Sequence, residues 1–383
     1  MKKIVALILA LTVLFTLAAC GGATPSVAPS TAPTTSADST GNSIASSEEE
    51  WPEMTLMLST YAAENNWSSI TSRMFIDKVE ERTGGKITFD EYFDGTLANA
   101  RNAADFLAGG SADCGDMVTI FSTKFALTSL MLSVPGGPSD MKGTSELLQK
   151  LRAAHPEIEE EWEKNGVHPV VYKFSEPYIL IGNGVDSLDD IKGAKVGCGT
   201  AQITNWLNEI GAIVVATLSS ENYQNYKTNV ISAGVHNPGT VADYKLYEVV
   251  DSVVTMNLPS IAGTSALVFN LDVWNGLPAN VQELFTEIGQ EVQDEYVEWM
   301  TDYYEKNMQL FADEGLNVTE LSEEKLQSWF DQILSSSQNN TIQQYIDNAN
   351  AAGYDGAQIV SDYLTLGEEM GVVWPFDASV YKK

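Results

Sequence analysis

Few residues of this chain are spaced for catalysis. The three histidines, His155, His168 and His236, stand far apart, and no G-x-S-x-G, P-loop or H-E-x-x-H motif is present. Asp and Glu make up 52 of the 383 residues, so paired carboxylates occur too often for their spacing to identify a site. We therefore expect each histidine to be structural, and the sequence predicts no enzyme, no metal site and no cofactor.

Cysteine occurs at Cys20, Cys114 and Cys198. Three thiols and three imidazoles leave little room for a disulfide framework or a structural zinc site. We expect Cys114 and Cys198 to be buried thiols, and a disulfide between them stays open as the alternative.

The charged residues argue against nucleic acid as a partner. The formal net charge is −31, whereas a phosphate backbone is bound by clustered Lys and Arg. Arginine occurs only at Arg73, Arg82, Arg101 and Arg152. The second half of the chain therefore offers no guanidinium group to an acidic ligand.

The N-terminus indicates export and lipidation. Lys2 and Lys3 precede an apolar run over residues 4–17, and Leu-Ala-Ala-Cys ends at Cys20, as in a bacterial lipoprotein signal peptide. We expect residues 1–20 to be a signal peptide that is cleaved before a lipidated Cys20. An ordinary signal peptide and a buried N-terminal helix are the alternatives.

A tether is predicted to follow the signal. Residues 21–50 are rich in Ser, Thr, Ala, Pro and Gly and show no hydrophobic period, so they cannot offset their ordering entropy by burial. The expected location is therefore extracytoplasmic, with a folded part anchored to the bacterial cell membrane through Cys20.

From residue 51 onward, strand and helix patterns alternate, which favours an α/β fold with mostly parallel sheets. Expected strands cover residues 55–59, 86–89, 112–120, 167–173, 195–198 and 213–216, and expected helices cover residues 68–82, 99–108, 145–165 and 202–210.

The longest pattern predicts a helix over residues 279–314. Apolar residues recur there with a 3.6-residue period, Pro278 stands before its start and Gly315 after its end. At 1.5 Å per residue the helix would measure about 54 Å, which exceeds one small domain. We expect it to run as a spine across two lobes.

Four segments in order resemble one protein family. They are residues 86–97 (KITFDEYFDGTL), residues 189–196 (DDIKGAKV), Asn237-Pro238 with residues 244–249 (YKLYEV), and Leu277-Pro278 before the long helix. Together they resemble the solute-binding subunits of TRAP transporters, the DctP-like extracytoplasmic receptors of ion-driven uptake systems. The resemblance covers roughly residues 51–355.

This resemblance implies a periplasmic-binding-protein-like fold with two α/β lobes, a hinge, and a small organic solute held in the cleft between them. Lobe I is expected over residues 51–174 and 263–302, lobe II over residues 175–262 and 303–355, and a C-terminal extension over residues 356–383. The receptor would be a monomer that delivers its solute to membrane permease subunits. A receptor of similar shape for an ABC importer or a sensor kinase, and an extracytoplasmic hydrolase, are the competing classes.

Several residues are expected to contact the solute, because they follow the carboxyl ends of strands or match cleft segments of the family. They are Thr60, Tyr61, Asp116, Met117, Val118, Phe174, Glu176, Gly197, Cys198, Gly199, Thr200, Trp206 and Asn237. Asn237 matches the asparagine before proline that hydrogen-bonds solute in the family.

The chain departs from the family at two positions. Gly197 stands where most members have an arginine that grips a solute carboxylate, and Glu176 stands near a position where some relatives have a second arginine. We therefore expect a neutral, polyhydroxylated, aromatic or cationic solute and poor binding of dicarboxylates. The alternative is a monocarboxylate held by backbone N–H groups of the helix after Thr200, or by Lys173, Lys195 or Lys227.

Overall fold

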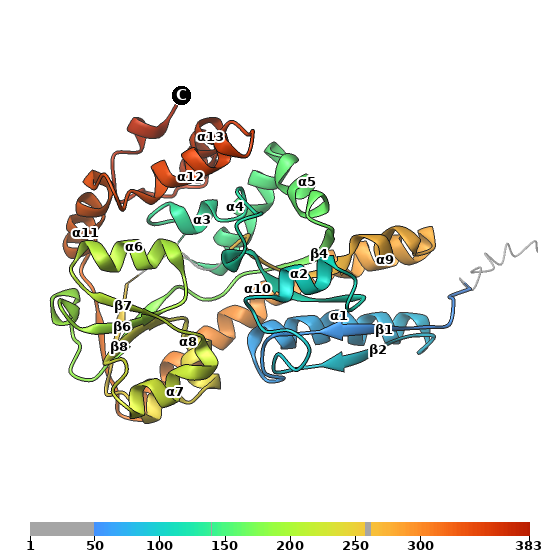
Figure 1. Cartoon of the computed structure of the whole chain (residues 1–383), viewed down its shortest axis with the longest axis horizontal. Coiled ribbons are helices and arrows are strands. Elements are labelled where there is room, and N and C mark those ends of the chain that lie inside the picture. The colour runs from blue at the N-terminus through green and yellow to red at the C-terminus, as the bar shows by residue number, and fades with distance from the viewer. Residues whose placement is uncertain (1–49, 139, 257–261) are drawn as a thin grey trace, which may run out of the picture. The chain divides into compact units, whose positions relative to one another are not determined.

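The computed structural model describes residues 50–138, 140–256 and 262–383. The predicted signal peptide, Cys20 and all but the last residue of the tether lie outside the described residues. The described residues contain two mixed sheets with helices packed around them (Figure 1).

The first sheet has five strands in the order β2-β1-β3-β10-β4. Strand β1 is parallel to β2 and β3, whereas β10 runs antiparallel to both β3 and β4. The strands are β1 (Met54–Ser59), β2 (Ile87–Tyr92), β3 (Cys114–Val118), β4 (Val167–Lys173) and β10 (Ser265–Asn270).

The second sheet has six strands in the order β11-β9-β5-β8-β6-β7. Here β5 is the strand that runs antiparallel to its two neighbours, β8 and β9. The strands are β5 (Ile179–Gly182), β6 (Lys195–Cys198), β7 (Ile213–Ala216), β8 (Ala233–His236), β9 (Ser252–Thr255) and β11 (Asn317–Glu320). In the described part of the chain each sheet thus has one strand against the others, which confirms the mostly parallel α/β prediction.

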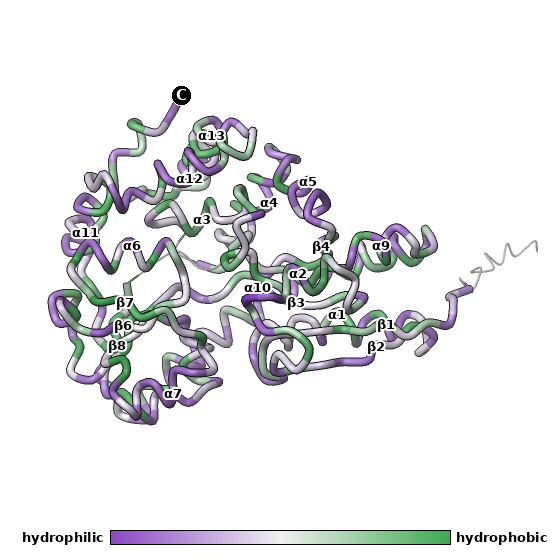
Figure 2. The backbone as a smooth tube through the Cα atoms, viewed as in Figure 1, coloured by the Kyte–Doolittle hydropathy of each residue, from purple (hydrophilic) through white to green (hydrophobic). Residues whose placement is uncertain are grey.

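The helices that cover the sheets are α1 (Trp67–Thr83), α2 (Ala103–Ala108), α3 (Leu130–Ser133), α4 (Met141–Ala154), α5 (Glu157–Lys164), α6 (Ala201–Glu209), α7 (Ser219–Lys227), α8 (Pro238–Asp243), α9 (Leu271–Gly276), α10 (Ala279–Asp313), α11 (Glu323–Ser335), α12 (Thr341–Ala351) and α13 (Gly356–Glu369). Hydrophobic and hydrophilic stretches alternate along outer helices such as α11 and α13 (Figure 2). Within the described ranges, no helix is both long and apolar enough to cross a membrane.

Helix α10 confirms the predicted spine. Its 35 residues begin at Ala279, as predicted, and end at Asp313, one residue before the predicted end. Val281, Phe285 and Ile288 pack in a hydrophobic cluster with β1, β10 and α1, whereas Phe311 belongs to a separate cluster with β5, β9 and α8. One helix therefore joins the cores of both sheets.

The predicted helix over residues 145–165 is wrong as a single element. The structure has two helices there, α4 and α5, which are separated at His155 and Pro156. Pro156 has no N–H to donate and biases the preceding residue away from helical dihedrals, and His155 accordingly has φ −129° and ψ 77°. Helix α4 also begins earlier than expected, because the Asp140 carboxylate accepts the Gly143 N–H at 2.7 Å and caps it.

The C-terminal helices pack on the first-sheet side. Helix α12 contacts α3, and α13 contacts α4 (Figure 1, red and green helices). Tyr363 and Trp374 are buried in the same cluster as residues of α4, so the chain beyond residue 356 is part of this core.

Close packing of α10 on β4 depends on Gly289. A Cβ added at Gly289 would lie 2.2 Å from the carbonyl oxygen of Val170. We expect Gly289→Ala to lower the free energy of unfolding by about 1–3 kcal/mol, because overpacking outweighs the roughly 1 kcal/mol that Ala gains over Gly in a helix. Urea denaturation measures the change.

Gly276→Ala at the end of α9 is the matched control, because an added Cβ there meets no atom within 4 Å. Its free energy of unfolding should stay the same or rise. Equal stability of the two variants would contradict the close approach of α10 to β4.

Candidate functional site

A cavity of about 210 Å³ is lined by residues from the connections of both sheets. Tyr61 follows β1 and Phe121 follows β3 on the first-sheet side, while Thr200 follows β6, Thr217 follows β7 and Asn237 follows β8 on the other. These positions lie beyond the carboxyl ends of parallel strands, where open α/β sheets bind their ligands. We take this cavity, called the cleft below, as the candidate site.

Five expected solute contacts line the cleft: Tyr61, Val118, Gly199, Thr200 and Asn237. The hydroxyl groups of Thr200 and Tyr178 lie 3.1 Å apart and form a hydrogen bond. The side-chain oxygen of Asn237 accepts the Thr240 N–H at 3.0 Å and caps α8. That oxygen is thus engaged, and a solute would use the NH₂ group of Asn237.

The other eight expected contacts are buried and stand outside the lining. They are Thr60, Asp116, Met117, Phe174, Glu176, Gly197, Cys198 and Trp206. Their own contacts hold the elements that form the cleft.

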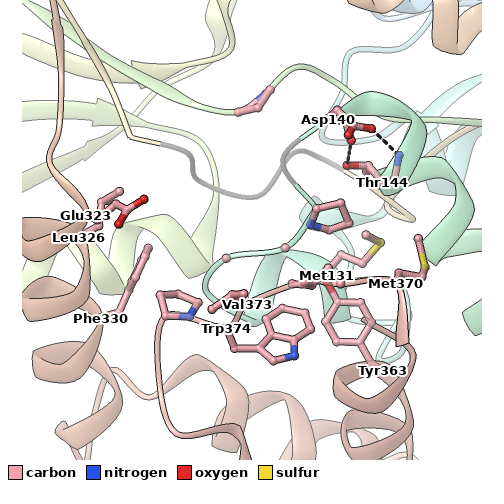
Figure 3. A pocket seen from close by; sticks show the side chains of 18 of the residues that line it. Met131, Asp140, Thr144, Glu323, Leu326, Phe330, Tyr363, Met370, Val373 and Trp374 are labelled. Carbon is pink, nitrogen blue, oxygen red and sulfur yellow. Dashed lines mark hydrogen bonds between the residues drawn. The ribbon is translucent and has the colours of Figure 1, made fainter. Parts of the chain in front are cut away.

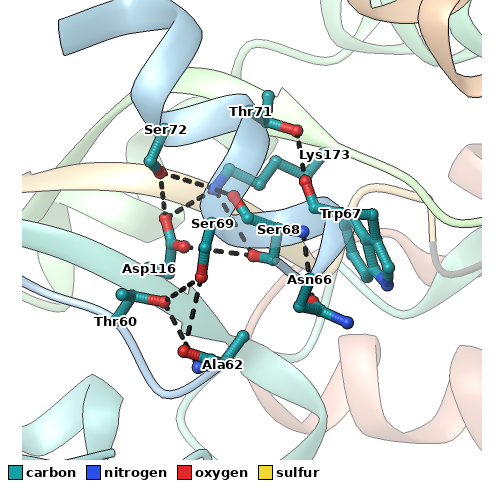
Figure 4. A network of polar contacts seen from close by, with 10 residues as sticks. All are labelled: Thr60, Ala62, Asn66, Trp67, Ser68, Ser69, Thr71, Ser72, Asp116 and Lys173. Carbon is teal, nitrogen blue, oxygen red and sulfur yellow. Dashed lines mark hydrogen bonds and ion pairs between the residues drawn. The ribbon is translucent and has the colours of Figure 1, made fainter. Parts of the chain in front are cut away.

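Asp116 forms a buried ion pair with Lys173 (Figure 4). The Lys173 Nζ lies 2.5 Å from Asp116 Oδ1, and it also donates to the Ser68 carbonyl at 2.5 Å and to the Ser72 hydroxyl at 2.7 Å. Ser72 and Ser68 in turn donate to Asp116. Burial lowers the pKa of Lys173 and the Asp116 charge opposes that effect. This network, called the Asp116–Lys173 network below, fixes the start of α1 against β3 and β4.

Thr60 fixes the loop that carries Tyr61. Its hydroxyl accepts the Ala62 N–H at 3.2 Å and lies 3.1 Å from the Ser69 hydroxyl (Figure 4). Burial, followed by the charge of Asp116, raises the pKa of Tyr61 above its ordinary range. Tyr61 therefore presents a neutral phenol to the cleft.

Four of the buried residues have packing roles. Phe174 packs edge-on against Tyr296, with ring centroids 5.1 Å apart. Met117 belongs to the core of the first sheet. Trp206 is fully buried and donates its indole N–H to Thr341 at 3.1 Å. Cys198 is a free thiol in the core of the second sheet, and burial raises its pKa to about 11.

Cys114 is also free and buried, which confirms the prediction of two buried thiols. The histidines have separate surroundings. His155 lies 2.9 Å from Glu157, and His168 stacks on Trp274 with ring centroids 4.0 Å apart.

His236 is a cleft residue that the sequence analysis did not identify. It ends β8 directly before Asn237, and it lines the cleft. Burial lowers the pKa of its imidazole to about 4, so the ring is neutral at physiological pH. The sequence feature that could have identified His236 is its position directly before Asn237, the asparagine that matches the family's cleft residue.

Gly197 leaves no free space for a side chain. A Cβ at this position would lie 2.8 Å from Ile231 Cδ1 and 3.2 Å from Thr217 Oγ1. Thr217 itself lines the cleft and is buried, yet its hydroxyl has no hydrogen-bond partner among the residues that the structure describes. An unpaired buried hydroxyl in a cavity wall is suited to bind a polar solute.

Glu176 and Asp243 form an acidic pair beside the cleft. The fully buried Glu176 accepts the Gly239 N–H at 2.9 Å. Asp243 accepts the Asn66 amide at 2.7 Å and the Tyr303 hydroxyl at 2.6 Å. Burial raises the pKa of Glu176 to about 7 and that of Asp243 to about 6. The Asn66–Asp243 bond joins the start of α1, on the first-sheet side, to α8, on the second.

A second hollow of about 510 Å³ lies between the loop before α4, helix α11 and the C-terminal segment (Figure 3). Met131, Leu326, Phe330 and Trp374 give it apolar walls. Of its polar side chains, Asp140 caps α4, and Thr144 donates to the Asp140 carbonyl at 3.0 Å. These groups serve the helix itself, and we assign the hollow no ligand.

Comparison with known proteins identifies the family. Residues 58–344 match DctP, described as bacterial extracellular solute-binding protein, family 7. The chain belongs to the DctP family. It is therefore a solute-binding receptor of the TRAP type and not an enzyme.

Similar proteins support the same fold. A solute-binding protein of Sulfitobacter sp. strain NAS-14.1 is 27% identical over 224 residues, which cover 58% of this chain and 67% of that protein. A TRAP solute-binding protein from Rhodoferax ferrireducens, solved with copurified benzoate, has a TM-score of 0.73 at 17% identity and covers 83% of this chain and 98% of its own.

Two further structures come from the same family. A TRAP periplasmic protein from Sulfitobacter sp. NAS-14.1 with bound β-D-galacturonate has a TM-score of 0.69 at 18% identity over 82% of this chain and 100% of its own. A Bordetella pertussis receptor that binds pyroglutamic acid has a TM-score of 0.68 at 20% identity over 81% of this chain and 99% of its own. The two-lobed α/β fold expected from the sequence is thereby confirmed.

The buried Glu176 should make stability depend on pH. Its pKa rises from 4.5 unfolded to about 7 folded, so its stabilising effect is complete below pH 4.5 and is lost as pH rises through 7. The loss is on the order of 3 kcal/mol at most. Glu176→Gln mimics the protonated acid and keeps the bond to Gly239. We expect the variant to match wild type at pH 5 and to exceed it by about 1–3 kcal/mol at pH 8.

Chemical denaturation at the two pH values measures this effect. The control is Glu298→Gln, which removes an exposed carboxylate of α10. It should change the free energy of unfolding little at either pH. A Glu176→Gln variant that lost stability at pH 8 would show that the carboxylate is needed in its ionised form.

Proposed function

We propose that this protein is the lipid-anchored extracytoplasmic receptor of a TRAP-type secondary transporter. It captures one small organic solute in the cleft and delivers it to membrane permease subunits, acting as a monomer. The observation that carries the proposal is a cavity lined by both sheets at the carboxyl ends of their strands, in a chain of the DctP family.

The proposed mechanism is closure of two lobes around the solute. A solute that contacts residues after β1 and β3 and residues after β6 to β8 stabilises the closed arrangement over the open one. The Asn66–Asp243 bond, 2.7 Å long, already connects the two sides. The continuous helix α10 and the segment that holds Glu176 remain in contact with both sides and are suited to act as the hinge.

We also propose the lobe boundaries expected from the sequence. Lobe I comprises residues 51–174 and 263–302, and it contains the five strands of the first sheet. Lobe II comprises residues 175–262 and 303–355, and it contains the six strands of the second sheet. Helix α12 falls within this range but packs on the first-sheet side, in one cluster with residues of α4. Residues 356–383 would be an extension that packs on lobe I.

The size of the cleft favours a metabolite as the solute. Pockets for drug-sized ligands measure about 300–1,000 Å³, and the cleft, at about 210 Å³, suits a smaller molecule. The relatives bind molecules of that size, namely benzoate, pyroglutamic acid and galacturonate. A single small organic solute is therefore proposed for this chain.

A metabolite screen by thermal shift tests the receptor function. Residues 51–383 should unfold at a higher temperature with one class of small solute, since a ligand at a hundred times its Kd adds about 2.7 kcal/mol. Thr217→Val removes the unpaired hydroxyl of the cleft and should weaken the binding of that solute about 2- to 10-fold without loss of stability in the free protein.

Thr264→Val is the matched control. The Thr264 hydroxyl is buried and also lacks a hydrogen-bond partner among the described residues, but Thr264 is not part of the cleft lining. This variant should bind the solute as wild type does. A screen of acids, sugars, polyols and amines in which no compound raises the unfolding temperature would contradict the receptor function.

The anchor is proposed from residues 1–50. Cleavage before Cys20 would attach a diacylglycerol, and more than one acyl chain is needed for stable anchoring. A coil of residues 21–50 would span roughly 30 Å on average, which would let the receptor reach a permease.

Cys20→Ser should release the full-length protein from the membrane fraction into the medium or periplasm. Fractionation after a high-salt wash, with immunoblotting, measures the distribution. Cys114→Ser, at a buried thiol, controls for loss of a cysteine elsewhere and should remain in the membrane fraction. Equal membrane retention of Cys20→Ser and wild type would exclude lipid anchoring at this residue.

A further inference from the structure

The cleft holds no cationic side chain. Of the side chains that line it in the described part of the chain, none belongs to Lys or Arg, and burial keeps the imidazole of His236 neutral by lowering its pKa to about 4. A solute carboxylate would therefore lose its hydration without gaining a charged partner.

The lysines that the sequence analysis considered are engaged elsewhere. Lys173 donates to Asp116, Ser68 and Ser72 in the Asp116–Lys173 network. Lys195 is exposed on β6. The ammonium group of Lys227 lies over the ring of Tyr223, 5.4 Å from its centroid. None of the three lines the cleft.

Arg101 is the arginine that contacts the cleft wall. Its guanidinium lies 5.0 Å from the ring centroid of Phe121, which does line the cleft. Arg101 itself is exposed and is not part of the lining. It therefore stacks on the wall of the cleft and leaves the interior without a positive charge.

Helix N-termini also attract anions, and at two of the helices that begin at the cleft, α1 and α8, side chains of the protein occupy them. The Asn66 side chain accepts the Ser68 N–H at the start of α1. At α7, Glu221 accepts only the N–H of Leu218, the residue before the helix. At α8, Asn237 and Glu176 accept the N–H groups of Thr240 and Gly239. Helices α6 and α7 have no side-chain cap, so both leave their first N–H groups to a ligand.

The lining instead combines one carboxylate with aromatic rings. Asp94 lines the cleft in a left-handed backbone conformation with φ 59°. Tyr61, Trp67, Phe121, Tyr178 and Tyr244 also line it. Aromatic faces and a carboxylate together attract a cation and repel an anion.

We infer that the cleft selects a small solute that bears no anionic group, and that it binds an amine-type cation more tightly than an uncharged molecule of the same shape. The inference rests on the proposed receptor function. It distinguishes this chain from the relatives solved with benzoate, galacturonate and pyroglutamic acid, whose ligands carry a carboxylate.

The test compares molecules of one shape and different charge. Benzoate, benzamide and benzamidinium are nearly isosteric and carry charges of −1, 0 and +1. Pyroglutamate with its amide, and galacturonate with galactose, give two further pairs. Binding to residues 51–383 is measured by calorimetry, and by saturation-transfer NMR up to millimolar concentrations. In each set that binds, the uncharged compound should bind at least about tenfold more tightly than the anion, and benzamidinium about threefold to tenfold more tightly than benzamide.

Asp94→Asn tests the source of the cation preference. Asn is tolerated at positive φ, so the loop should keep its conformation, and the preference for benzamidinium over benzamide should fall to about one. Asp90→Asn changes the net charge equally at an exposed residue of β2 outside the cleft. That control should keep the wild-type preference, which separates local recognition from the general negative charge of the protein.

Tighter binding of an anion than of its uncharged counterpart, in any set, would overturn the inference while leaving the receptor function intact, and would assign the carboxylate to the uncapped start of α6 or α7. If no compound of these sets binds, the charge of the solute found by the metabolite screen tests the inference. An anionic solute would overturn the inference, and a neutral or cationic solute would support it. If the screen also finds nothing, the proposed receptor function fails and the inference fails with it.

Discussion

The Asp116–Lys173 network positions the start of α1, which brings Asn66 and Trp67 to the cleft. Asp116 lies in β3 and Lys173 ends β4, and β10 runs between these two strands. The ammonium group also binds Ser68 and Ser72 on α1, so one buried charge pair joins two strands and a helix. Burying such a pair costs several kcal/mol of hydration per ion, which the serine hydroxyls and the Ser68 carbonyl offset. Removing either partner would leave an uncompensated charge, so the start of α1, with Asn66 and Trp67, depends on both.

The acidic pair has the corresponding position at the hinge. Glu176 lies between β4 and β5, where the chain passes from the first sheet to the second, and its carboxylate accepts a backbone N–H at the start of α8. Asp243, at the end of α8, binds Tyr303 of α10 and Asn66 of α1. Through these bonds the cleft wall, the connecting segment and the spine helix share one polar network. Because burial raises the pKa of both carboxyls, the hinge region is more stable in slightly acidic conditions than in alkaline ones.

Elements with a long or repeated pattern could be predicted from the sequence, and contacts between distant segments could not. Helix α10 shows its 3.6-residue period over nine turns, so its bounds were predictable, whereas the break between α4 and α5 depends on Pro156, a single residue inside a strong helical pattern. The chain motifs indicated Asn237 and residues 197–200. They gave no indication of Thr217, since this residue reaches the cleft only when separate strands of the second sheet align. Asp116 was expected at the solute because it stands at the end of a predicted strand. Its partner Lys173 lies 57 residues away, and no sequence pattern indicates the pair.

Gly197 stands where the resemblance to the family places an arginine, and its surroundings leave little room for one. The space beside Gly197 holds Ile231 and the Thr217 hydroxyl, and Gly234 on the adjacent strand faces Tyr226 and His236 in the same way, since a Cβ there would lie 2.5 Å from the Tyr226 hydroxyl and 2.6 Å from His236 Nε2. Two glycines on paired strands thus make room for an isoleucine, a phenol and a neutral imidazole. An arginine at position 197 would meet the buried Ile231 side chain and could be accommodated only if that side chain moved. The packing of β6 and β8 therefore agrees with the proposed preference for solutes without an anionic group.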